Sequence, residues 1–272
     1  MKKILLSLFM VVAITTSVTA ATTTYEPANR VQAIGTNLLT KNGITTNDVK
    51  FMVVSDTPSN ADFASTKTVY VSAQELSFTG NDNEVASVVA SELGHIIYGH
   101  GSSKKVFNML ESNVNTNIAT SSSVKTFASN YKTTKQDKEA DLVAVNLMVN
   151  AGYNPLALIV VLTKQTGTYW DTVVGRPANA DKAMNVFDYI SYVYPEKIKV
   201  GYGCNEYRNF KSYADTILEE RKNNKKLAST YNKDYSKAKK NTEKQISSFK
   251  IRGGLSAWDA VYGIMNATQS SN

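Results

Sequence analysis

Residues 83–101 read NEVASVVASELGHIIYGHG, and the expected fold is built outward from them. Their apolar residues recur every three or four positions, as on one side of an amphipathic helix. These are Val85, Val88, Val89, Leu93, Ile96 and Ile97. Asn83 suits the start of such a helix and Gly101 its end. Gly94 inside the helix costs roughly 1 kcal/mol relative to alanine, so we expect another element to pack close to its backbone.

Three polar residues of this helix form a candidate metal site. Ser91 and His95 are four residues apart, so they project from one face with Glu92 beside them. In the H-E-x-x-H motif, residues at this spacing bind zinc through two histidines, and the glutamate polarises the attacking water. Here serine replaces the first histidine and the motif reads S-E-L-G-H. A lone E-x-x-H is also common on amphipathic helices, where the histidine is simply packed or solvated.

The histidine content restricts the ligands of such a site. His95 and His100 are the two histidines of the chain. At about 100° per residue, His100 lies about 140° around the helix from His95 and cannot replace Ser91 as a ligand on the same face.

The first residues, MKKILLSLFMVVAITTSVTA, have the pattern of a secretory signal peptide. Lys2 and Lys3 precede an apolar run that ends at Ile14, which is well short of the roughly 20 residues needed to span a bilayer. We expect cleavage after Ala20 or Ala21, a mature chain without a transmembrane segment, and export to the periplasm or the cell exterior. The single cysteine, Cys204, excludes an internal disulfide framework.

Elements on either side of the central helix follow from periodicity. Residues 28–41 read as a helix, 49–54 as a strand, 59–65 as a loop and 66–73 as an alternating strand. A strand just before a metal helix could pair with an extended peptide, although an ordinary sheet strand has the same pattern. Residues 102–136 are expected to be a mobile loop with a short helix near 106–110.

A second helix is expected from Asp137 to Pro155, which reads DKEADLVAVNLMVNAGYNP. Two acidic residues, Glu139 and Asp141, stand at the start of this mostly buried helix. They could stabilise the helix N-terminus through its dipole. Alternatively, Glu139 could complete a zinc site, as in proteases with two histidines and one glutamate.

The order of these features resembles the gluzincin family of the CAAX prenyl endopeptidase and heat-shock protease X. The resemblance covers about residues 29–190 and rests on TVYVSA, NDNEVASVVASELGHIIYGH and KEADLVAVNLMVNAGYNP taken together. Exported members include periplasmic proteases that also act as outer-membrane assembly chaperones. The resemblance implies an α+β gluzincin-type metallopeptidase domain with an active-site helix, a small sheet with an edge strand, and a second ligand helix.

The resemblance also implies roles for individual residues. Zinc would be held by His95 and Glu139, with Ser91 in the place of the missing ligand, and Glu92 would be the general base. The strand that holds the substrate backbone would be Thr68, Val69, Tyr70, Val71, Ser72 and Ala73.

Two residues depart from the family pattern at the site. Ser91 replaces a zinc ligand, and Arg176 stands where the family has a supporting histidine before proline, with Lys182 in place of the usual arginine. A structural zinc site contributes on the order of 10–16 kcal/mol, so losing one of four ligands weakens zinc binding about a few hundredfold. Arg176 could stabilise an oxyanion. It could equally offset carboxylates in a metal-free site.

The C-terminal residues differ in composition from the rest. Residues 206–227 and 231–251 read as long polar helices, followed by an amphipathic helix from Leu255. Between Arg221 and Lys250 ten Lys or Arg residues stand against two Asp or Glu, whereas the whole chain has a net charge of +7. This extension is either a solvated helical hairpin or a dock for an anionic envelope surface. Nucleic acid is not expected as a partner.

We therefore expect a signal peptide at residues 1–20, a metallopeptidase-like domain at 21–193 and a basic helical extension at 194–272. One functional hypothesis is an exported zinc endopeptidase that acts on polypeptides, with activity impaired by Ser91. The alternative is an inactive pseudopeptidase that binds extended chains along residues 68–73 as a chaperone or scaffold. The fold supports both.

Overall fold

The computed structural model describes residues 27–44, 49–54, 68–100, 122–165 and 176–251. The signal peptide expected at residues 1–20, the loop at 59–65, the short helix near 106–110 and the last helix from Leu255 lie outside these ranges. No helix in the described part of the chain is both long enough and apolar enough to cross a bilayer.

The fold is mostly helical, with one small sheet, as an α+β domain would be. Helix α1 (Pro27–Lys41) precedes strands β1 (Lys50–Val54) and β2 (Thr68–Ser72). The two strands pair in parallel, from Lys50 opposite Thr68 to Val54 opposite Ser72. The expected strand at 66–73 ends one residue early, because Ala73 already begins the short helix α3 (Ala73–Leu76). The side chains of Val69 and Val71 are buried, whereas those of Tyr70 and Ser72 are partly exposed.

The central helix is α4 (Asp82–Tyr98), which starts and ends one or two residues before the positions expected. Asn81, rather than Asn83, is the N-cap, and its side chain accepts hydrogen bonds from the backbone N–H groups of Asn83 and Glu84. Gly99 ends the helix at φ 71°, in the left-handed region that glycine adopts without strain.

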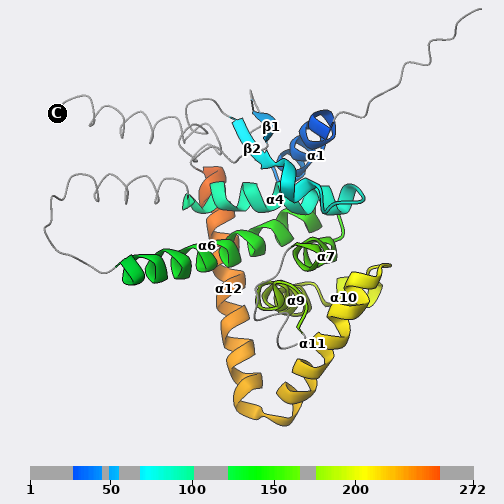
Figure 1. Ribbon diagram of the computed structural model, residues 1–272, viewed down its shortest axis with the longest axis vertical. Helices are drawn as coiled ribbons and strands as arrows, with labels where there is room; N and C mark the ends of the chain where they lie inside the picture. The colour runs from blue at the N-terminus through cyan, green and yellow to red at the C-terminus, as the bar shows by residue number, and fades with distance from the viewer. Residues whose placement is uncertain (1–26, 45–48, 55–67, 101–121, 166–175, 252–272) are drawn as a thin grey trace, which may run out of the picture.

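Helix α6 (Ser122–Asn150) crosses α4 and is much longer than the helix expected from Asp137. The two helices run across the middle of the molecule, with α1 and the sheet on one side of α4 (Figure 1). The two backbones come close together at Gly94. A Cβ atom there would lie 2.9 Å from the Cα atom of Ala140 on α6. The prediction that another backbone packs against Gly94 is confirmed.

Two further helices complete the core below α6. Helix α7 (Leu156–Lys164) is apolar on every side and buried from Leu156 to Leu162, and α9 (Ala180–Val193) packs against it. A short helix, α10 (Pro195–Val200), follows α9.

The basic extension is a hairpin of two long helices, α11 (Asn205–Asn223) and α12 (Lys225–Ile251). The second helix begins six residues before the expected start because Asn224 caps it, accepting hydrogen bonds from the N–H groups of Lys226 and Leu227. The hairpin forms a V below α9 (Figure 1). Five of its side chains join the same hydrophobic core as α4 and α6: Tyr207, Phe210, Ala214, Ile246 and Phe249.

Candidate functional site

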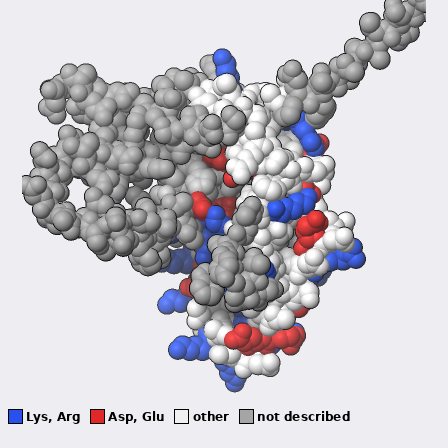
Figure 2. Space-filling view, viewed as in Figure 1, with Lys and Arg blue, Asp and Glu red and all other residues white. Residues whose placement is uncertain are grey.

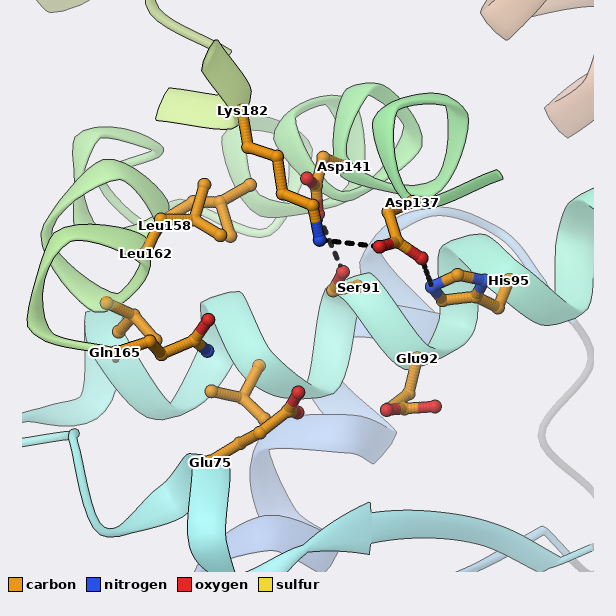
Figure 3. A pocket seen from close by; sticks show the side chains of 12 residues that line it. Glu75, Ser91, Glu92, His95, Asp137, Asp141, Leu158, Leu162, Gln165 and Lys182 are labelled. Carbon is orange, nitrogen blue, oxygen red and sulfur yellow. Dashed lines mark hydrogen bonds and ion pairs between the residues drawn. The ribbon is translucent and has the colours of Figure 1, made fainter. Parts of the chain in front are cut away.

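A polar pocket lies between α4 and α6 and is closed by α3, α7 and α9. Its volume is about 110 Å³. Figure 3 shows Asp137, Asp141 and Lys182 above α4, whereas Glu92 points below α4, toward the side on which Glu75 extends from α3. The pocket is lined by Glu75, Val88, Ser91, Glu92, His95, Asp137, Asp141, Leu158, Val161, Leu162, Gln165 and Lys182.

Ser91 faces α6 inside this pocket, but its hydroxyl is already engaged. It donates a hydrogen bond of 2.8 Å to Oδ1 of Asp141. Removal from water raises the pKa of Asp141 to about 6, and the bond from Ser91 opposes that shift. The serine therefore satisfies a buried carboxyl group, and the pocket gains no second imidazole.

His95, Asp137 and Lys182 form a chain of groups across the pocket (Figure 3). Nε2 of His95 lies 3.8 Å from Oδ1 of Asp137, and the ammonium of Lys182 lies 2.5 Å from Oδ2 of the same carboxylate. Burial lowers the pKa of His95, so its ring is neutral at neutral pH. The ion pair of the pocket is therefore the one between Lys182 and Asp137.

His100 contacts the ring of His95 and does not itself line the pocket. The Nδ1 atoms of the two rings are 3.0 Å apart, so the ring that is protonated at Nδ1 donates a hydrogen bond to the other. His100 stacks on Tyr98, and burial lowers its pKa to about 4. The helix ends at Tyr98, so the sequence argument that placed His100 about 140° around the helix from His95 does not apply; the two rings meet, although His100 does not line the pocket with Ser91.

Glu139, predicted as the third zinc ligand, does not line the pocket. Its carboxylate lies 3.4 Å from Nε2 of His100 and 3.9 Å from the ammonium of Lys135. Asp137 and Asp141 take the pocket positions instead, because residues four apart share a helix face while Glu139 lies about 200° around from Asp137. Their spacing, which matches that of Ser91 and His95 on the facing helix, was the sequence signal for this pair.

Arg176, predicted either to stabilise an oxyanion or to offset carboxylates in a metal-free site, also lies outside this pocket. Its guanidinium pairs with Asp181 and rests over the ring of Tyr213, 5.6 Å from the centroid. It lines a separate cavity of about 530 Å³ beside α11. The cation of the candidate site is Lys182, which sequence analysis noted only as a replacement for arginine.

Glu92 is in the pocket, where burial is the main influence on its acidity. Removal from water, with smaller contributions from the carboxyl groups of Glu75 and Asp137, raises its pKa to about 8. Burial also raises the pKa of Glu75, a pocket residue that sequence analysis missed because it lies on the four-residue helix after β2. A general base must be a carboxylate, so in this arrangement Glu92 reaches that state only above about pH 8.

The pocket does not provide the donor set that zinc prefers. Catalytic zinc takes three protein ligands of the imidazole, thiolate or carboxylate type. Here the hydroxyl of Ser91 is hydrogen-bonded to Asp141, and the carboxylate of Asp137 is already paired with the ammonium of Lys182. No group of three or more His, Cys, Asp or Glu side chains that could hold a metal ion is found among the residues described.

The substrate strand predicted at 68–73 corresponds to β2 and the first residue of α3. Within the described ranges, β1 is the only strand that pairs with β2. The strand leads directly into α3, which carries Glu75 to the pocket. The two features are therefore joined by one short piece of chain.

A mostly helical domain with a pocket between two crossed helices and an S-E-L-G-H motif is the arrangement expected of a metallopeptidase-like protein. The model of peptidase family M48 matches residues 26–221, more than half of the chain. The chain therefore belongs to peptidase family M48, whose members are zinc metallopeptidases. The comparisons found no curated protein and no solved structure that matches it.

Proposed function

We propose that this chain is a pseudopeptidase, a member of the M48 family that binds extended polypeptides and does not hydrolyse them. The observation that carries the proposal is the ion pair between Lys182 and Asp137 beside His95. In an active metallopeptidase, the charge between such groups would be supplied by the metal. Here the ammonium of Lys182 supplies it.

Two effects oppose zinc binding at this site. Serine at position 91 removes an imidazole ligand, which weakens zinc binding about a few hundredfold. A zinc ion at His95 would also approach the ammonium of Lys182, and a doubly charged ion about 4 Å from a single positive charge is repelled by about 8 kcal/mol at an effective dielectric constant of about 20. The two effects act together because both residues face the same carboxylate pair on α6.

Peptide binding is the part of the family function that needs no metal. An extended chain can add to the edge of a sheet through backbone hydrogen bonds. Its side chains then point alternately to the two faces of the sheet, where pockets can select among them. We assign this role to β2, and the observation that supports the choice is that β2 leads into α3, which carries Glu75 to the pocket. The signal-peptide pattern of residues 1–20 supports the further proposal that this binding takes place outside the cytoplasm, on unfolded or assembling envelope polypeptides.

The metal hypothesis is tested by the zinc content of three purified forms after incubation with equimolar zinc and gel filtration. We expect no stoichiometric zinc in the native protein or in Ser91→His. We expect close to one zinc per chain in the double variant Ser91→His with Lys182→Met, where the ligand is restored and the competing cation is removed. Ser91→His with Lys211→Met is the matched control, because Lys211 pairs with an acid elsewhere. One zinc per native chain would overturn the proposal.

The binding hypothesis is tested with an unfolded client. Native protein should suppress aggregation of reduced insulin equally with and without chelator, and should leave unfolded casein intact. If casein is cleaved and Glu92→Gln abolishes the cleavage, the chain is an active peptidase and the pseudopeptidase proposal fails. Suppression that disappears with chelator would likewise contradict it.

A further inference from the structure

Five lysines of α12 lie on one side of the helix. At about 100° per residue, they fall within roughly 60° of arc, and at about 1.5 Å per residue they extend over about 27 Å. We call this the lysine face; it consists of Lys226, Lys233, Lys237, Lys240 and Lys244, all of which are exposed.

The lysine face lies opposite the side by which α12 is packed. Thr242, Ile246 and Phe249 are buried and point about 180° away from it. The helix contacts α9, α6 and α4 through that buried side. The rings of Tyr231 and Tyr235 turn the same way, and their hydroxyls donate to Asp188 and Asn185 of α9.

The charge of the lysine face is not neutralised by described acidic residues. None of its five ammonium groups forms an ion pair within the described ranges. The acid of α12 that does pair, Glu243, lies off the face and meets Lys239 at 4.0 Å. Lys and Arg side chains project along the edge of the molecule where the lower half of α12 runs (Figure 2).

We propose that the lysine face docks this protein on a membrane surface rich in anionic lipid headgroups. A row of cations on an exposed helix face matches a plane of mobile headgroups, because each lysine can meet its own lipid. An acidic polymer such as single-stranded nucleic acid is a poorer fit, because proteins bind such strands in basic grooves lined by exposed aromatic rings. Between the lysines the same side carries small polar residues, Ser229, Thr230 and Ser236, and the exposed Ile251 stands beyond the last lysine at the helix end, so the contact along the face is mainly electrostatic.

The proposal is tested by co-sedimentation of the full chain with vesicles. Vesicles of phosphatidylcholine alone are compared with vesicles of equal parts phosphatidylcholine and phosphatidylglycerol, at low and near-physiological ionic strength. Binding to neutral vesicles corrects for any contribution of the apolar N-terminal residues. Each lysine near an anionic surface contributes about fivefold, so replacing four of them by glutamine should weaken partitioning about 100-fold or more. The variant is Lys233→Gln, Lys237→Gln, Lys240→Gln and Lys244→Gln.

A control of equal charge change separates the lysine face from net charge. It carries Lys41→Gln, Lys50→Gln, Lys199→Gln and Lys250→Gln, four exposed positions away from the face. We expect this control to lose no more than about fivefold. Equal losses in both variants, or unchanged binding of the first, would overturn the proposal. Tighter binding to soluble polyphosphate than to anionic vesicles would overturn the choice of a membrane. Glutamine keeps the helix propensity of lysine, and circular dichroism checks that both variants fold.

Discussion

At the scale of single residues, the pocket brings three carboxyl groups near Glu92, Ser91 and His95 with one cation to balance them. The pKa of Glu92 is raised to about 8 and that of Asp141 to about 6. Both groups therefore hold protons in the folded chain at pH values where the unfolded chain has released them. Folding stability in this protein should be tied to pH through the same residues that form the candidate site.

Glu92→Gln tests that link. Between about pH 4.5 and 8 the folded chain binds a proton at Glu92 that the unfolded chain does not, so stability falls as pH rises through this window. Glutamine removes the effect. We expect the variant to exceed the native protein in free energy of unfolding by roughly 2 kcal/mol or more at pH 8.5, and to match it near pH 4.5.

The measurement is urea unfolding across this pH range. Glu220→Gln, on the exposed side of α11, is the control and should follow the native curve. Parallel pH profiles for Glu92→Gln and the native protein would contradict the prediction. Asp141 should leave a residual slope up to about pH 6 in the variant.

Gly94→Ala tests the crossing of α4 and α6. Alanine normally favours a helix over glycine by roughly 1 kcal/mol, but here its Cβ would meet the backbone of Ala140. Backbone cannot rotate away as a side chain can, so we expect a net loss of about 1–3 kcal/mol. Gly203→Ala, where an added Cβ meets nothing within 4 Å, should be close to neutral. The check is the thermal midpoint of each variant, and a stabilised Gly94→Ala protein would refute the prediction.

At the scale of elements, sequence periodicity predicted α4, the β2 region and the start of the hairpin, because each has a clear apolar pattern. It failed where tertiary contacts decide. The first half of α6 is polar and has no apolar stripe at helical spacing, and α7 is apolar on all sides, so neither gives a periodic signal. The candidate site could likewise be predicted only in part. Ser91, Glu92 and His95 lie in one motif on α4 and could be placed from it. Asp137 and Lys182 reach the pocket from α6 and α9, and only the tertiary packing of these helices brings them there.

The hairpin is fixed to α9 by a partly buried ion pair. The guanidinium of Arg221 donates two hydrogen bonds, of 2.9 and 2.8 Å, to the carboxylate of Asp188. It also lies 4.3 Å from the centroid of the Tyr231 ring on α12. Arg221 of α11 thereby contacts both α9 and α12. Removal from water raises the pKa of Asp188 in spite of this partner, so the carboxylate depends on Arg221 to stay charged.

Arg221→Met should therefore destabilise the protein by about 3 kcal/mol, since it leaves a carboxylate inside without its partner. Hydrogen exchange should rise in α12 and in the last turns of α11 before it rises in α4. Lys222→Met is the neighbouring control, because its side chain is exposed. The double variant Asp188→Asn with Arg221→Met should recover part of the loss. If the single and double variants are equally unstable, the pair is not the fixing contact.

At the scale of the whole molecule, the extension predicted at 194–272 shares its core with the domain before it. Phe210 of α11 packs edge to face on Phe187 of α9, with 5.6 Å between centroids, and both are fully buried. The family match also continues to residue 221, through most of α11. The polar composition of α11 and α12 hides this, because only a few of their residues face inward.

A chain truncated after Tyr194 should therefore not keep the native fold. We expect loss of the near-ultraviolet circular dichroism signal and exposure of apolar surface that binds a fluorescent dye, because the cover over Phe187 and Tyr189 is removed. A truncation after Ile251 keeps every described helix and serves as the control. A native-like spectrum and a cooperative transition in the shorter form would instead establish residues 27–194 as an independent folding unit.

The ion pair of Lys182 with Asp137 has a consequence for how the protein meets its surroundings. A metal centre has to be loaded after synthesis, can be stripped by competing chelators, and can be filled with the wrong ion. A cation that is part of the polypeptide arrives with translation in fixed stoichiometry. If Lys182 replaces the metal as proposed, we expect the pocket to stay assembled through zinc starvation and to resist poisoning by copper or cadmium.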